Sequence, residues 1–452
     1  MSRWLTPVML LIAGLCVAAV ITLKTCVGPR AGRDGFVLSL DPSGVNGIRI
    51  GNGGEIFELK RKGSGWQIEG GKLRDRADPA VVAELLKEAA TLIYYDRISS
   101  GEVRSRDELS RFGLKSPKRW VEFEDHGRHK IFFGNESVVE GRIYALLEGS
   151  NDVFLVDDKL AGLVSAGLDK LRDLRLTDLA SGQVDRVIVR REEGEMDIVR
   201  GPEGWRVVKP FSAAADETRV LEFLDALLGL KISGFAGDDT GDLGVHGIEE
   251  GKSEIALYVE GRSRPLLLRF GARKGGEILA QFTPRDSVIR LPEATFDMVS
   301  AQPDQFRDRR LMPLNLDTID LIRIGSPDSS FDLQRDGERW RVVASDGSRP
   351  ASQAALQRMI TALGETRVAQ FLGQSPPTEP PVRTVRFFSI LSENTPEARA
   401  GEHPVAGISL WPNGEGGVIA AIDGSGGTVV VQEDLPSAIP TGPSDWSLPV
   451  AP

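Results

Sequence analysis

The chain contains four histidines, and two of them, His126 and His129, lie close enough in sequence to share a metal ion with Asp125. They flank Gly127 between two apolar runs, a pattern that indicates a hairpin turn. Further ligands that a zinc site requires are missing from the surrounding sequence. We therefore predict no metal site here and interpret the segment as a turn.

A second candidate is the segment 247–253, Gly-Ile-Glu-Glu-Gly-Lys-Ser, which resembles the end of a phosphate-binding loop. Its spacing is one residue short, because the first glycine of that motif falls on His246. The segment 109–117 occupies the corresponding earlier place, between a predicted helix and the strands that follow it. We expect a loop that closes the helix against the next strand. Since no Gly-x-Ser-x-Gly elbow accompanies the histidines, we predict no enzymatic activity, no catalytic residue and no cofactor.

An Arg-Asp pair occurs twice in similar surroundings, as Arg172-Asp173 within residues 171–176 and as Arg307-Asp308 within residues 306–311. Arginine can hold a carboxylate or a phosphate through two parallel hydrogen bonds, so the pair could form a ligand clamp. Alternatively, it ends one unit and pins the connector to the next. We favour the structural interpretation, because the motif recurs at a boundary and does not converge with other polar groups.

These residues belong to a unit that the chain uses three times. Trp66, Trp205 and Trp340 lie 139 and 135 residues apart, and each follows an apolar run that opens 21 residues earlier. We expect these tryptophans to pack in cores, although tryptophan is also enriched at the centres of protein interfaces. After each tryptophan, a small polar residue precedes an apolar stripe spaced by three and four, which predicts a capped amphipathic helix. The predicted caps are Asp78, Asp216 and Ser352.

Downstream of each helix the pattern changes to short β-rich runs separated by turn residues. The runs are residues 120–123, 131–133, 143–146 and 154–156; 255–259, 266–270, 278–282 and 288–291; and 408–411, 418–422 and 428–431. The predicted fold class is α+β: three tandem repeats, each an antiparallel β-meander with one packed amphipathic helix, behind an N-terminal transmembrane helix. The expected domains are a membrane anchor at 1–33 and repeats at 34–178, 179–314 and 315–452. The third repeat is degenerate: it lacks the Arg-Asp ending, and its proline-rich tail, residues 436–452, indicates a loose terminus.

The anchor is predicted from residues 4–23, which carry no charge and are long enough to span the hydrocarbon core of a bilayer. A cleaved signal peptide is the rival interpretation, but the apolar run is longer than usual and no Ala-x-Ala site follows it. We expect an uncleaved single pass in the bacterial inner membrane, with the bulk of the chain in the periplasm. Cys16 and Cys26 both precede that bulk, so it is predicted to contain no disulfide and no catalytic cysteine.

Composition agrees with a globular protein of several domains. The chain has 452 residues, of which 41% are hydrophobic and 27% charged. Its formal net charge is −10, with acidic and basic residues interspersed, so we expect no nucleic-acid partner.

Taken together, the motifs resemble a bacterial family of domains of unknown function (number four-three-four-zero). They are the Gly-Trp after a hairpin, the Leu-Ser-Arg-Phe-Gly-Leu-x-x-Pro segment, the Phe-Gly-Asn and Ile-Tyr-Ala runs and the closing Arg-Asp-x-Arg-Leu. The resemblance covers residues 45–311 and the first half of the third repeat. Relatives are often encoded beside a Gld-type ABC transporter, of the kind tied to gliding or envelope export, and the family has no established catalytic residues. The resemblance implies a non-enzymatic accessory subunit of such a transporter.

The sequence therefore leaves two possible functions. The first is a membrane-anchored accessory or scaffold subunit that contacts an ABC transporter permease or other envelope subunits. The alternative is an exported ligand-binding receptor or hydrolase with a site in a cleft between repeats. A receptor should carry polar residues unique to one copy, whereas a scaffold shows only residues shared between copies. The sequence indicates the second pattern, so we favour the accessory subunit.

Overall fold

The computed structural model describes residues 35–446, apart from residues 71–72, 101–106, 239–240, 284, 286, 313, 315, 374, 390–404, 415–416, 424–426 and 432–434. The predicted anchor at 4–23, both cysteines and His403 lie outside the described residues. Within the described part of the chain, no helix combines the length and the apolar character needed to cross a membrane.

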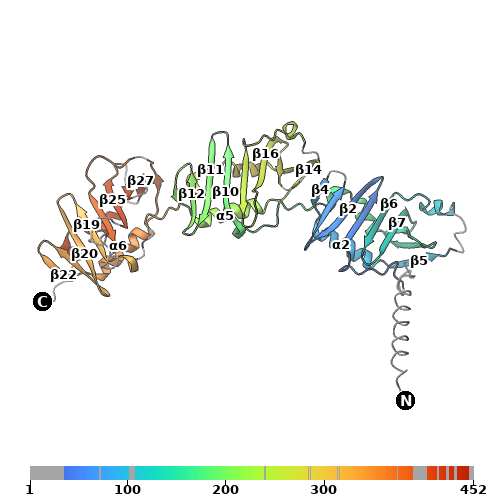
Figure 1. Cartoon of the computed structure of the whole chain (residues 1–452), viewed down its shortest axis with the longest axis horizontal. Coiled ribbons are helices and arrows are strands. Elements are labelled where there is room, and N and C mark those ends of the chain that lie inside the picture. The colour runs from blue at the N-terminus through green and yellow to red at the C-terminus, as the bar shows by residue number, and fades with distance from the viewer. Residues whose placement is uncertain are drawn as a thin grey trace, which may run out of the picture. The chain divides into compact units, whose positions relative to one another are not determined.

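The fold is mostly β and consists of three antiparallel sheets, each of nine strands (Figure 1). The strand orders are β4-β3-β2-β1-β6-β7-β8-β9-β5, β13-β12-β11-β10-β15-β16-β17-β18-β14 and β22-β21-β20-β19-β24-β25-β26-β27-β23. Because the three orders are equivalent, one topology has been used three times, as the tryptophan spacing predicts. The helical share is smaller than the predicted α+β class implies.

All eleven predicted runs lie within strands, but β24, the first strand of the meander in the third repeat, was not predicted. In the first sheet they are β1 Gly47–Asn52, β2 Glu55–Lys62, β3 Gly65–Gly70, β4 Leu73–Arg76, β5 Tyr94–Ile98, β6 Arg119–Glu124, β7 Arg128–Glu136, β8 Arg142–Leu147 and β9 Val153–Asp157. In the second they are β10 Val184–Arg191, β11 Gly194–Gly201, β12 Gly204–Lys209, β13 Ala213–Ala214, β14 Gly234–Gly237, β15 Glu254–Val259, β16 Leu266–Lys274, β17 Glu277–Phe282 and β18 Val288–Pro292. In the third they are β19 Leu321–Ser326, β20 Ser329–Asp336, β21 Arg339–Ala344, β22 Gly347–Pro350, β23 Gln370–Phe371, β24 Arg383–Phe388, β25 Ala406–Pro412, β26 Val418–Ile422 and β27 Thr428–Val431.

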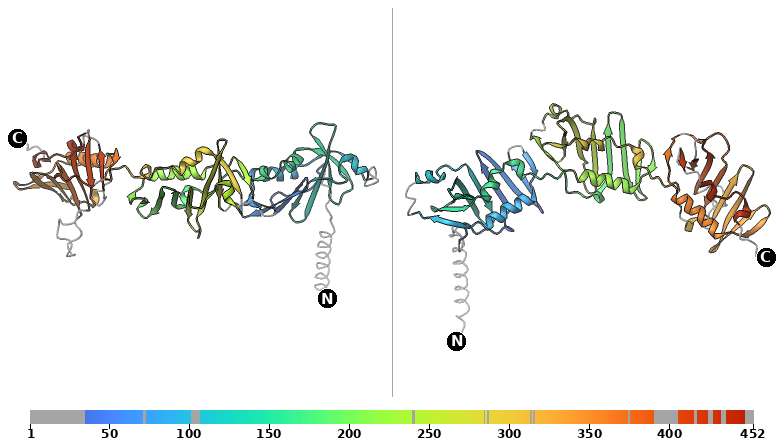
Figure 2. Two further views of the ribbon diagram at one scale, coloured as in Figure 1. Left: turned by 90° about the horizontal axis from the view of Figure 1, so that it is seen from above. Right: turned by 180° about the vertical axis from the view of Figure 1, so that it is seen from behind.

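One long helix lies across a face of each sheet: α2 Pro79–Ala90, α5 Glu217–Leu228 and α6 Gln353–Glu365 (Figures 1 and 2). Shorter helices are α3 Lys159–Ser165, α4 Leu168–Leu171, η1 Glu108–Phe112, η2 Ser181–Gln183, η3 Leu243–His246, η4 Glu293–Met298, η5 Pro303–Phe306, η6 Leu316–Thr318, η7 Leu435–Ala438 and η8 Pro443–Trp446. The predicted caps are confirmed, because each cap side chain accepts a hydrogen bond from a backbone N–H of the first turn. Asp78 accepts from Ala80 N at 2.8 Å, Asp216 from Arg219 N at 3.3 Å and Ser352 from Ala355 N at 3.3 Å.

The three tryptophans occupy the same place, the second residue of β3, β12 and β21. Trp205 and Trp340 are buried, with 2% and 6% of their surface exposed, so the prediction of core packing is correct for them. Trp66 is half-buried against the core of the first sheet, with the Arg61 guanidinium 5.2 Å from its ring. The prediction therefore holds only in part for Trp66.

The strand that follows each long helix was not predicted from the sequence. β5, β14 and β23 pair with the last strands of their sheets, β9, β18 and β27, and so form the edge opposite to β4, β13 and β22. β5 is half-exposed to exposed along its whole length, so it carries no apolar alternation that would reveal it. In the second and third repeats, the residues just before this strand are hydrogen-bonded to the connector from the preceding repeat.

The prediction of a loose terminus is wrong for residues 436–446. Trp446 is completely buried in the third core, and its indole N–H donates to Pro440 O at 3.1 Å. Its carbonyl accepts from Ser352 N, just as Leu171 O accepts from Asp78 N and Phe306 O from Asp216 N. The third repeat thus closes at the same position as the others, with a tryptophan where they carry Leu171 and Phe306.

The chain divides into two compact units, residues 1–195 with 223–300 and residues 196–222 with 301–452. We call residues 171–176 with the side chains around them the first junction, and it lies wholly within the first unit. We call residues 306–311 with their surroundings the second junction, and it lies within the second unit.

Candidate functional site

The connector of the first junction is hydrogen-bonded on both sides. On one side, Asp173 N donates to Arg76 O at 2.9 Å, next to an isolated bridge between Ala77 and Arg172. On the other side, Leu176 N donates to Leu230 O at 3.0 Å, and Ile232 N donates to Leu174 O at 2.7 Å. Its backbone therefore joins the end of β4 in the first sheet to residues 230–232, which lead into β14 of the second repeat.

Arg172 is buried at this junction, with 1% of its side chain exposed. Its Nε donates to Asp75 Oδ2 at 2.7 Å, and its Nη2 donates to Asp238 Oδ1 at 2.8 Å. The guanidinium also lies 3.6 Å from the centre of the Phe235 ring, a cation–π contact. Asp75 comes from β4, whereas Phe235 and Asp238 come from β14 and the residue after it. One arginine thus binds both repeats.

Arg285, from the loop after β17, completes the buried network, and 2% of its side chain is exposed. Its Nε donates to Asp75 Oδ1 at 2.8 Å, while its Nη1 and Nη2 donate to the carbonyls of Arg175 and Asp173 at 3.0 and 2.7 Å. Burial lowers the pKa of Arg285, and the neighbouring Asp75 carboxylate partly offsets that effect. Asp75 therefore bridges two arginines from opposite sides of the junction.

Asp173 is buried and accepts four hydrogen bonds. Arg76 Nη2 donates to its Oδ2 at 2.8 Å, and Arg175 donates through its backbone N at 3.0 Å, its Nε at 3.0 Å and its Nη2 at 2.8 Å. Burial is the largest single influence on the pKa of Asp173 and would raise it. The hydrogen bonds from Arg175 and the charge of Arg76 outweigh burial, so the pKa of this carboxyl is lowered.

The second junction repeats the backbone pattern with different side-chain contacts. Asp308 N donates to Ala214 O, and Leu311 N donates to Thr366 O. Arg307 stacks on Phe371 at 3.7 Å, as Arg172 stacks on Phe235, and its Nη1 lies 3.3 Å from Asp304 Oδ1. Both Arg-Asp pairs therefore lie where the structural interpretation places them, at a connector held between two repeats.

The charges around the first junction are specific to it. Arg74, Asp75 and Arg76 of β4 precede Ala77, which binds Trp66 O as Ala215 binds Trp205 O. When the repeats are aligned on Ala77 and Ala215, the second repeat carries Ser212, Ala213 and Ala214 at the positions of Arg74, Asp75 and Arg76. The expectation that polar residues would be only those shared between copies is therefore wrong for β4. Comparing the copies residue by residue, rather than motif by motif, would have shown this difference.

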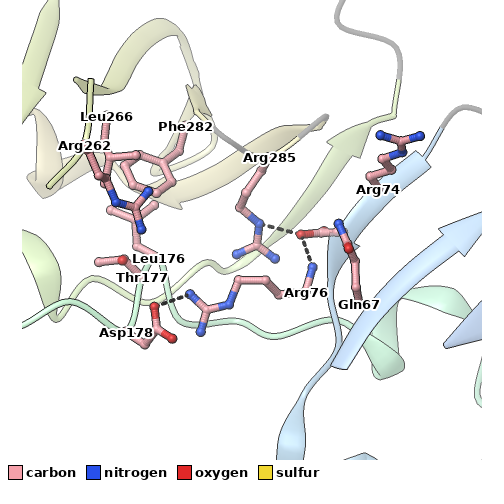
Figure 3. Close-up of a pocket in the computed structure, with 11 residues that line it drawn as sticks. Gln67, Arg74, Arg76, Leu176, Thr177, Asp178, Arg262, Leu266, Phe282 and Arg285 are labelled. Carbon is pink, nitrogen blue, oxygen red and sulfur yellow. Dashed lines mark hydrogen bonds and ion pairs between the residues drawn. The ribbon is translucent and has the colours of Figure 1, made fainter. Parts of the chain in front are cut away.

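A cavity of about 220 Å³ opens beside this network (Figure 3). It is lined from the first repeat by residues of β3 and β4, from the connector by residues 176–178, and from the second repeat by residues of β16, β17 and their flanking loops. The lining residues are Gln67, Arg74, Asp75, Arg76, Leu176, Thr177, Asp178, Arg262, Leu266, Phe282 and Arg285. This cavity is the candidate functional site.

The other sequence candidates lie in ordinary turns. His129 Nε2 is 3.2 Å from Asp125 Oδ1 in the turn between β6 and β7, and the described residues contain no group of side chains able to hold a metal ion. Gly247 ends η3 with a φ of 69°, and Gly113 ends η1 with a φ of 71°. The resemblance of 247–253 to a phosphate-binding loop is thus explained by a left-handed helix end that both repeats share.

The comparisons with known proteins place the chain in a family. No curated protein matches the chain at a significant level. A family model matches residues 76–251 and residues 205–384, which together cover more than half of the chain. The first matched segment includes Arg172-Asp173 and the second includes Arg307-Asp308, so each contains one of the two junctions. The chain belongs to the family described as Domain of unknown function (DUF4340).

Proposed function

We propose that this protein is a non-enzymatic accessory or scaffold subunit of an envelope ABC transporter of the gliding or export type. A single uncleaved transmembrane helix at residues 4–23 holds it in the bacterial inner membrane, with the three repeats in the periplasm. Each repeat presents a β-meander with one packed amphipathic helix. The uncharged apolar span and the family resemblance support this proposal.

The observation that carries the proposal is the use of charge at the first junction. Arg172, Arg285 and Asp75 are each buried, and their described side-chain hydrogen bonds run to one another, to Asp169 and Asp238, to the backbone N–H of Arg76 and to connector carbonyls. Groups of this kind are often reactive in an enzyme, but here they hold two sheets against one connector. Such use of buried charge supports a scaffold, a protein that holds binding surfaces in fixed positions.

Co-purification from native membranes tests the assignment. A full-length chain with an affinity tag after Pro452, extracted in mild detergent, is expected to retain an ABC transporter permease and its ATPase. The matched control lacks residues 1–33 and should lose both partners, because it is no longer held at the membrane. Recovery of the full-length chain without any transporter subunit would refute the proposal.

Membrane placement has its own test. A reporter that is active only in the periplasm, fused after Pro452, is expected to be active. Activity of a reporter that works only in the cytoplasm would overturn the placement without touching the partner assignment.

A second candidate function is an exported ligand-binding receptor, and one observation favours it. The cavity at the first junction is lined by charged β4 residues that the second repeat lacks. The same observation does not support the hydrolase form of that alternative, because the two aspartates on the lining, Asp75 and Asp178, are both paired with arginines.

A further inference from the structure

The cavity beside the first junction has an excess of positive charge. Four of its lining residues are arginines, Arg74, Arg76, Arg262 and Arg285, and two are aspartates, Asp75 and Asp178. Figure 3 shows Arg76, Arg262 and Arg285 reaching towards one space from different elements, with Arg74 apart from them. The lining therefore contains two more arginines than aspartates.

The aspartates are already paired within the protein. Asp75 accepts from Arg172 and Arg285, and Asp178 Oδ1 accepts from Arg76 Nη1 at 3.3 Å. Arg262, in contrast, is exposed, and its side chain makes no hydrogen bond or ion pair with any residue that the structure describes. The charge that remains to be balanced therefore lies at the mouth of the cavity, where an ion from solution can reach it.

The fold does not require these charges. Ser212 and Ala214 stand where Arg74 and Arg76 stand in β4, and the second sheet forms the same strand order with them. Arg262 lies in the turn between β15 and β16, where any polar residue would serve. Arg74 and Arg262 are thus arginines that packing does not need, beside a cavity that Arg76 and Arg285 also line, and such an arrangement is a feature of anion recognition.

We propose that this cavity binds a small oxyanion of the phosphate class. Its volume of about 220 Å³ is below the roughly 300–1,000 Å³ of pockets for drug-sized ligands, so it suits a single phosphate group with a short substituent. A phosphate monoester carries about −1.5 to −2 charges at pH 7, so its charge is opposite in sign to the excess of arginines on the lining. Gln67 and the hydroxyl of Thr177 are further hydrogen-bond donors on the wall.

The bound anion would contact both repeats. Arg76 and Gln67 belong to the first sheet, whereas Arg262 belongs to the second repeat. A ligand that binds only the folded junction stabilises it by RT ln(1 + L/Kd), where L is the ligand concentration, so the stabilisation rises with the logarithm of that concentration above the Kd. The inference does not depend on the transporter assignment, because it concerns only this cavity.

The test is binding of inorganic phosphate to the full-length chain in detergent, measured by calorimetry and by the shift in melting temperature. Chloride at equal ionic strength controls for general screening. Arg262→Gln should weaken phosphate binding by about tenfold or more, since one charged hydrogen bond is lost. Arg264→Gln is the matched control, because Arg264 is an exposed arginine of the same turn that does not line the cavity. It should bind phosphate as the native chain does.

A second arm identifies the source of the phosphate group. Glycerol phosphate stands in for a lipid headgroup, and tighter binding of it than of inorganic phosphate, lost in Arg262→Gln, would indicate a substituted phosphate as the natural ligand. Preference for inorganic phosphate would indicate the free ion. The proposal is overturned if neither compound binds at millimolar concentration, or if Arg262→Gln and Arg264→Gln bind equally well.

Discussion

Replacing Asp75 with alanine tests how much the buried network contributes to the first junction. The substitution removes the acceptor of three hydrogen bonds, from Arg172 Nε at 2.7 Å, from Arg285 Nε at 2.8 Å and from the backbone N–H of Arg76 at 2.8 Å. It also introduces the residue that the second repeat carries at this position, Ala213. Alanine is therefore compatible with the strand, so any loss of stability is due to the arginines that no longer have the Asp75 carboxylate as a partner.

The magnitude follows from burial. The side chains of Asp75, Arg172 and Arg285 are 0%, 1% and 2% exposed, so the two arginines cannot turn to water when the carboxylate is removed. Breaking a buried pair by removing one partner costs about 3–5 kcal/mol. At about 2–4 °C for each kcal/mol in domains of 150–250 residues, the melting temperature should fall by roughly 6–20 °C.

Asp332→Ala supplies the matched control. Asp332 makes a two-pronged pair with Arg323 at 2.8 and 3.0 Å, but these side chains are 21% and 42% exposed. Such a surface pair contributes at most about 1 kcal/mol. Melting of the full-length variants should be followed together with hydrogen exchange at Asp173 N and Leu176 N, because a chain of several sheets does not unfold in two states.

The double variant Asp75→Ala, Arg285→Met should recover part of the loss, since one of the two stranded charges is gone. The reasoning is refuted if Asp75→Ala and Asp332→Ala lower the melting temperature equally and leave exchange at the connector unchanged.

Three further outcomes are expected. Arg307→Ala should destabilise the chain by about 1–3 kcal/mol in thermal melts through loss of its contacts with Phe371 and Asp304; unchanged stability with loss of anion binding would instead make it a recognition residue. The folded-state pKa of Asp173 is lowered, so its stabilisation is complete above the ordinary value of 3.8 and is lost as the pH falls through the lowered one. The difference in melting temperature between the native chain and Asp173→Asn should therefore shrink only in that acid range, and a constant difference down to the lowest pH would contradict the assignment. Trp446→Ala should cost about 3–5 kcal/mol in the third repeat, because the indole is completely buried, and a loss below about 1 kcal/mol would restore the loose terminus.

The sequence predicts the elements that a local pattern encodes. Helix α2 has a cap at Asp78 and a periodic apolar face, and the later strands of each sheet are apolar runs between turn residues, so each can be read within a short window. Strand β5 escapes prediction because pairing with β9, and not burial, forms it. The closure by Trp446 escapes because no Arg-Asp pair marks it.

The candidate site could be predicted only in part. Arg172-Asp173 is visible as a repeated pair, but Arg285 meets Asp75 across 210 residues of sequence. A single arginine in a hairpin loop has no spacing or periodicity that would single it out. Only the fold, which brings the loop after β17 to the edge strand β4, turns those two residues into neighbours.

The doubly bonded connector has a consequence for how the chain can be divided into fragments. In the first repeat, residues 35–37 are hydrogen-bonded to the residues that lead into β5: Val37 N donates to Leu92 O, and Tyr94 N donates to Gly35 O. Residues 174–176 make the equivalent bonds in the second repeat, and residues 309–311 make them in the third. In the sequence an Arg-Asp pair precedes each of these segments, at 33–34, 172–173 and 307–308, always 33 residues before the repeat's tryptophan. The unit of duplication therefore opens with the Arg-Asp pair rather than closing with it. An excised second repeat that begins after residue 176 would leave residues 230–232 without their backbone partner, whereas one that begins at Arg172 keeps it.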